Sequence, residues 1–131
     1  MTIQTLVLDS EGLSKAVRDD RQVMAMLEQA RLDDAAVVTS AVTLVEARDP
    51  RTPQARFDWV LSRIEIVPVS EQIARQASRL LAAASLHGHK YALDALVAAT
   101  ALLPPGPAVI LSSDPDDLAA LTQSPVRVVK V

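Results

Sequence analysis

The stretch Thr5-Leu-Val-Leu-Asp-Ser-Glu-Gly12 decides the fold of this 131-residue chain. Its apolar run stops at an acid, Asp9, and turn-forming residues follow. A short run of aliphatic and β-branched residues that ends in this way is typical of a strand buried on both faces. Ligands bind outside the carboxyl ends of the strands in open α/β sheets, so Asp9 is predicted to lie at the functional edge.

Apolar segments of helical and extended type alternate along the rest of the chain. Further strands are predicted at residues 35–38, 64–67, 109–111 and 126–131. Helices are predicted at residues 13–30 with a break at 18–21, at 41–47 capped by Thr39 or Ser40, from Pro53, from Ser70 to a stop at Gly88, at 90–103, and after Ser112. This order implies right-handed βαβ crossovers, so residues 1–131 are expected to form a single α/β domain with a mainly parallel, about five-stranded sheet.

The composition excludes several classes of site. Half of the residues are hydrophobic and 22% are charged, which suits a sheet covered by helices on both faces. The absence of cysteine excludes disulfides, thiolate metal sites and a cysteine nucleophile, and three scattered glycines cannot make a phosphate-binding loop. The net charge of −3 carries no global nucleic-acid signature, and aromatic residues are too few for a base-stacking platform. No signal peptide or membrane span is expected, and the location is predicted to be cytoplasmic.

Four acids stand at positions where acids are unusual. Asp9 and Asp114 follow predicted strands, whereas Glu46 and Asp94 interrupt apolar helices. Each has a purely structural alternative: a helix cap for Asp9 and Asp114, an exposed helix face for Glu46, and a buried salt bridge to an arginine for Asp94. If the four meet at one edge, their carboxylates repel and raise one another's pKa, and Mg²⁺ or Mn²⁺ relieves this repulsion. Such a site can promote phosphoryl displacement by water.

Four blocks of sequence resemble PIN-domain proteins, specifically VapC-type toxins of bacterial toxin–antitoxin pairs. The blocks are residues 6–12, 43–47, 91–100 and 111–118. The resemblance implies a three-layer α/β/α fold and a Mg²⁺- or Mn²⁺-dependent endoribonuclease. It also implies an RNA substrate, a cognate antitoxin and a homodimer.

The resemblance also implies roles for individual acids. Asp9 and Asp94 would be the main metal ligands and Asp114 would assist them, while Glu46 would bind metal or orient the attacking water. Asp116 and Asp117 are expected in the first turn of a short helix, where the macrodipole favours acids, and Asp117 could contribute through a water. The basic residues that could line an RNA groove are Lys15, Arg18, Arg21, Arg48, Arg51, Arg56 and the segment 87–90.

Alternatives from other classes fit the sequence less well. A haloacid-dehalogenase-like phosphatase needs a second aspartate two positions after Asp9, and Glu11 stands there. A phospho-receiver domain needs an aspartate after the third strand, where Pro68 follows Val67. A PIN-like domain that binds RNA or protein without cleavage remains an alternative, against which the four acids argue.

Overall fold

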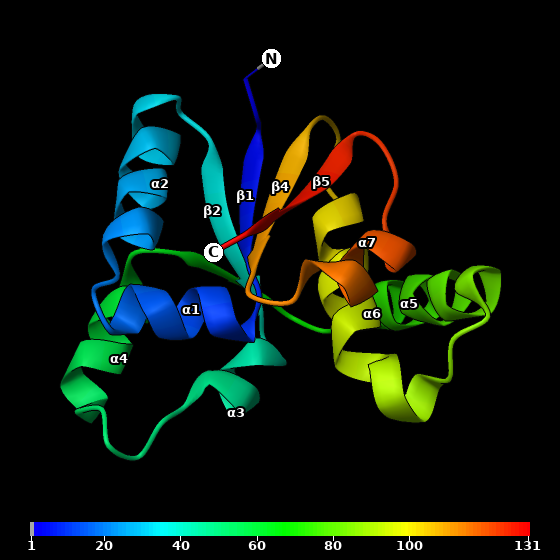
Figure 1. Ribbon diagram of the computed structural model, residues 1–131, viewed down its shortest axis with the longest axis horizontal. Coiled ribbons are helices and arrows are strands. Elements are labelled where there is room, and N and C mark those ends of the chain that lie inside the picture. The colour runs from blue at the N-terminus through cyan, green and yellow to red at the C-terminus, as the bar shows by residue number, and fades with distance from the viewer. Residues whose placement is uncertain (1) are drawn as a thin grey trace.

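The computed structural model describes residues 2–131, which contain one five-stranded sheet of order β3-β2-β1-β4-β5, with all its pairings parallel. The strands are β1 (Thr5–Leu8), β2 (Ala36–Ser40), β3 (Glu65–Val67), β4 (Ala108–Ser112) and β5 (Val126–Lys130). The helices are α1 (Ser10–Val17), α2 (Arg21–Leu32), α3 (Thr43–Ala47), α4 (Gln54–Ser62), α5 (Glu71–Ala84), α6 (Gly88–Leu102) and α7 (Pro115–Leu121). Figure 1 shows α1, α2 and α4 on one side of the sheet and α5, α6 and α7 on the other. The predicted three-layer α/β/α fold is therefore confirmed.

The central strand β1 explains why both faces of the sheet are covered. Leu6 and Leu8 belong to the core under α1, α2 and α4, whereas Val7 belongs to the core under α5, α6 and α7. This is the alternation expected of a strand with two buried faces. Leu8 is in register with Thr39 of β2 and with Leu111 of β4. The central strands therefore end at one edge, where Figure 1 also places α3.

The turn after β1 depends on Asp9 and Gly12. Asp9 is the N-cap of α1, and its Oδ1 accepts a hydrogen bond of 2.8 Å from the Gly12 N–H. A Cβ atom added at Gly12 would lie 2.8 Å from the backbone oxygen of Leu111, closer than real Cβ contacts come. Glycine therefore lets the first turn of α1 lie directly against the end of β4.

The second strand runs further than predicted, because Thr39 and Ser40 belong to β2. The Thr39 hydroxyl is fully buried and donates to the Leu8 carbonyl at 2.8 Å, so it ties β2 to β1. The N-cap of α3 is Val42, and Ser40 Oγ accepts from its N–H at 3.3 Å. The prediction that Thr39 or Ser40 is the N-cap residue was wrong, since strand pairing extends through both.

The helix stop predicted at Gly88 was also wrong. Helix α5 ends earlier, at Ala84, and its C-cap residue Ser85 adopts a left-handed conformation with φ of 55°. Gly88 is instead the first residue of α6, with His87 as its N-cap, so His89 lies in the first turn of that helix. None of the helices in residues 2–131 is long and apolar enough to cross a membrane.

Candidate functional site

Two of the predicted acids, Asp9 and Asp114, follow the ends of the neighbouring strands β1 and β4. The Asp9 N–H donates to the Leu111 carbonyl at 3.3 Å, which continues the strand pairing to the edge. Asp114 occupies the N-cap position of α7, but its side chain makes no capping hydrogen bond. Its N–H donates to the hydroxyl of Ser112 at 3.1 Å. The same hydroxyl hydrogen-bonds to the Asp9 carboxylate, so Ser112 links the two strand ends.

Asp9 combines a structural role with an unusual electrostatic position. Burial raises the pKa of its carboxyl, and this effect outweighs the hydrogen bonds from Gly12 and Ser112 that lower the pKa. The N-cap alternative is confirmed, since Oδ1 accepts from the backbone of Gly12. A carboxylate has about four lone-pair positions, so capping leaves acceptor capacity for a cation.

Glu46 is exposed on the short helix α3. Hydroxyl groups hold this helix at the edge of the sheet. The Thr43 hydroxyl donates to the Ser40 carbonyl at 2.7 Å and lies 2.5 Å from the hydroxyl of Thr39. Ser14 of α1 donates to the Ala47 carbonyl at 3.4 Å. The exposed-face alternative describes Glu46 correctly, and the buried contacts around it position its backbone near the strand ends.

Asp94 has the most perturbed carboxyl group of the site. Burial, followed by the charges of Asp117, Glu46, Asp9 and Asp114 in that order, raises its pKa to about 6. Within residues 2–131 the Asp94 side chain forms no ion pair and no hydrogen bond, so the predicted alternative of a salt bridge to an arginine was wrong. Asp9, Glu46 and Asp114 therefore all lie within electrostatic range of Asp94.

Two further residues near these acids, Asp117 and Ser112, were not among the four site residues predicted from the sequence. Asp117 is half-buried and raises the pKa of Asp94 more than the other acids do, whereas Asp116 is exposed and does not contribute. Asp117 follows Asp114 by three residues, a spacing that places both on one face of a helix start. Ser112 was not singled out, although a hydroxyl at a strand end near Asp114 was a usable signal.

The donor set fits a hard divalent cation. Asp9, Glu46, Asp94, Asp114 and Asp117 form no ion pair with an arginine, lysine or histidine in the described part of the chain. Carboxylate oxygens without cationic partners are the ligands that Mg²⁺ and Mn²⁺ prefer. As the side chains lie, no three acidic or histidine residues of the described chain are arranged to hold a metal ion. A cation would therefore have to draw in the exposed side chains of Glu46 and Asp114.

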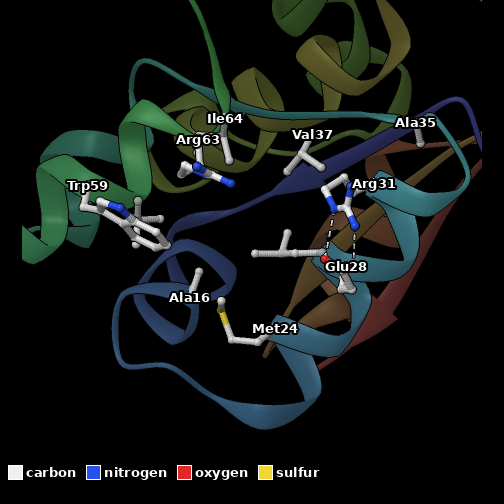
Figure 2. A pocket seen from close by; sticks show the side chains of 11 residues that line it. Ala16, Met24, Glu28, Arg31, Ala35, Val37, Trp59, Arg63 and Ile64 are labelled. Carbon is white, nitrogen blue, oxygen red and sulfur yellow. Dashed lines mark hydrogen bonds and ion pairs between the residues drawn. The ribbon is translucent and has the colours of Figure 1, made fainter.

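Two cavities help to delimit the site. A cavity of about 360 Å³ lies between α2 and α4, and none of the five acids lines it. Figure 2 shows Met24, Val37 and Trp59 among the residues that border it. A second cavity of about 290 Å³ lies between α1 and the segment after α3, and Glu46 forms part of its wall. The carboxylate cluster is thus separate from the apolar cavity and adjoins the polar one.

Comparison with known proteins identifies the family. The PIN domain profile matches residues 6–121. The sequence has no significant match among curated proteins. Similar solved structures include VapBC2 from Rickettsia felis, bound to a DNA fragment from its promoter, with a TM-score of 0.73, 17% identity, and coverage of 97% of this chain and 98% of that chain.

Two further structures share the fold. FitAcB from Neisseria gonorrhoeae has a TM-score of 0.67 and 23% identity, with 94% of this chain and 95% of that chain covered. A toxin–antitoxin complex from Klebsiella pneumoniae has a TM-score of 0.70 and 22% identity, with 92% of this chain and 94% of that chain covered. These likenesses establish the shared fold over nearly the whole chain. Together with the profile match, they show that the chain belongs to the PIN-domain family.

Proposed function

We propose that this protein is a metal-dependent endoribonuclease and the toxin of a toxin–antitoxin pair. The observation that carries the proposal is the Asp94 carboxyl, which has a pKa raised to about 6 among four other acids. Such a cluster lowers the stability of the folded protein, because like charges repel and burial penalises ionisation. Perturbed carboxyl groups that gather at the carboxyl edge of a parallel sheet are typical of a functional site.

The roles of the residues follow from their positions. Asp9 and Asp94 are the best-placed metal ligands, because both are partly buried and the backbone of β1 and α6 holds them. Asp114, which precedes α7, and Asp117 in its first turn complete the acidic cluster. The exposed Glu46 binds metal or accepts a proton from the water that attacks the phosphodiester. A Mg²⁺ or Mn²⁺ ion, when bound, offsets the carboxylate charge and promotes in-line attack on phosphorus.

The partners are proposed on the same basis. The solved relatives from Rickettsia felis and Klebsiella pneumoniae are a VapBC2 complex and a toxin–antitoxin complex, which supports a cognate antitoxin for this chain. RNA is the proposed substrate, and hydrolysis breaks an ester P–O bond as water forms a new one. We further propose one domain over residues 1–131, a homodimer and a cytoplasmic location.

The direct test is cleavage of structured and unstructured RNAs by the wild type and by Asp94→Asn. Reactions contain Mg²⁺, Mn²⁺ or EDTA. Cleavage that requires metal and disappears in the variant supports the proposal. Full activity of Asp94→Asn would refute the site assignment, and an inactive wild type under every metal would favour a non-cleaving PIN domain. The phosphatase alternative loses support from the family match and from the ion pair of Glu11 with Arg18, at 2.9 Å.

A further inference from the structure

The polar cavity beside Glu46 has no role in the site described above. It has a volume of about 290 Å³ and lies between the C-terminal half of α1 and the segment that joins α3 to α4. Glu46 forms part of its wall, so the cavity opens beside the carboxylate cluster. This volume is at the lower end of small-ligand sites and suits a single nucleotide unit rather than a larger group.

Two guanidinium groups line this cavity, and they differ in how they are held. Arg48 is pre-organised: its Nε donates to Gln54 Oε1 at 2.9 Å, its Nη1 donates to the Asp49 and Thr52 carbonyls, and the group lies 5.6 Å from the Phe57 ring centroid. Its Nη2 has no hydrogen-bond partner in residues 2–131. A fixed guanidinium whose Nη2 N–H groups are free loses little side-chain entropy when it binds an anion.

Arg18 is held only loosely. Its Nη2 pairs with Glu11 at 2.9 Å, and both side chains are well exposed. Exposed ion pairs of this kind contribute little to stability, so an anion can replace Glu11 as the partner of Arg18 without a large penalty. The Nε and Nη1 of Arg18 make no other hydrogen bond within the described chain.

We infer that this cavity is a subsite for the RNA nucleotide next to the scissile phosphate, with its backbone phosphate bound by Arg18 and Arg48. This inference rests on the proposed function, because it takes the carboxylate cluster as the place of cleavage. Arg18 can bind a phosphate through paired N–H bonds once it leaves Glu11, and Arg48 offers the N–H groups of its Nη2. Glu46 lies in the wall of the cavity and so connects the subsite with the carboxylate cluster. An acidic protein can in this way bind RNA locally despite a net charge of −3.

The test measures RNA binding separately from cleavage. Arg18→Gln is made in an Asp94→Asn background, and the affinity for a fluorescein-labelled, mixed-sequence RNA oligonucleotide is measured by anisotropy with Mg²⁺ and with EDTA. Loss of one charged phosphate contact is expected to weaken binding about tenfold. The slope of log affinity against log salt is expected to fall by about 0.7, as for one phosphate contact on a single strand.

Two further variants separate phosphate binding from a structural role. Glu11→Gln frees Arg18, so it should leave RNA affinity equal or raise it; a loss as large as that of Arg18→Gln would refute the inference. Arg75→Gln is the matched control, because Arg75 forms a similar exposed pair with Glu71, at 2.7 Å, on α5. An equal loss of RNA affinity in Arg75→Gln would also refute the inference, since the contribution of Arg18 would then not be specific to its position.

The outcomes distinguish this inference from the proposed function. If the wild type cleaves RNA but Arg18→Gln binds with the same affinity and salt slope, only the subsite is refuted. If the wild type neither cleaves nor binds RNA with any of the metals, the proposed function and the subsite are both refuted. In the otherwise wild-type enzyme, Arg18→Gln should raise KM and leave kcat nearly unchanged, because the lost contact is made equally in the ground state and the transition state.

Discussion

Replacement of Asp94 by asparagine should stabilise the metal-free protein at neutral pH. The folded state raises the pKa of this carboxyl from 3.8 to about 6. A shift of about two units corresponds to about 3 kcal/mol, at 1.36 kcal/mol per unit. Because Asp94 is only partly buried and solvent screens its neighbours, we expect about 1–2 kcal/mol. This gain corresponds to a rise in Tm of about 4–8 °C.

The sign of the pH dependence follows from proton linkage. The folded state holds the Asp94 proton more tightly than the unfolded state, so wild-type stability falls as the pH rises from about 4 to about 6. Asparagine cannot ionise, so this loss is absent in the variant. The two proteins should therefore be nearly equal in stability at pH 4 and differ fully at pH 7.5.

Thermal and urea unfolding in EDTA at several pH values would measure this difference. Asp58→Asn is the control, because it removes one charge from an exposed position on α4, and asparagine can still accept the 2.8 Å hydrogen bond from Gln54. The reasoning is refuted if Asp94→Asn is no more stable than the wild type at pH 7.5. It is equally refuted if the gain is the same at pH 4.

Three further predictions concern packing, positioning and metal. Gly12→Ala places a Cβ 2.8 Å from the Leu111 oxygen and should lower the free energy of unfolding in urea by about 1–3 kcal/mol. Gly88→Ala should be nearly neutral, because its Cβ meets only a side-chain carbon at 3.6 Å, and equal effects of the two variants would contradict this packing argument. Thr43→Val removes a buried hydroxyl that donates to the Ser40 carbonyl at 2.7 Å, and it should lower the free energy of unfolding by about 1–2 kcal/mol. Thr43→Ser should recover this stability, and an unchanged stability of the valine variant would show that the hydroxyl is dispensable. Calorimetric Mg²⁺ or Mn²⁺ affinity should fall as the pH drops below about 6, because protons compete for Asp94, and a pH-independent affinity would remove Asp94 from the ligands.

The sequence by itself determined the layers of the fold and the position of the first acid. The apolar run before Asp9 and the helical periodicity on either side of residues 18–21 are local patterns, and the structure confirms the strand and the break between α1 and α2. Local patterns are sufficient there because burial on two faces selects a short apolar strand irrespective of its distant neighbours. The four acids were also visible in the sequence, because two of them follow apolar strands and two interrupt apolar helices.

Only the tertiary structure decided how these acids meet and what surrounds them. Asp94 could have paired with an arginine, and only the tertiary arrangement, in which α6 packs against α7 and the sheet, brings it among acids instead. The ends of β2 and α5 were mispredicted, since Thr39 is held by a bond to Leu8 in another strand and Ser85 adopts a left-handed conformation. Electrostatic coupling and strand pairing depend on distances between residues far apart in the chain, which no local pattern contains.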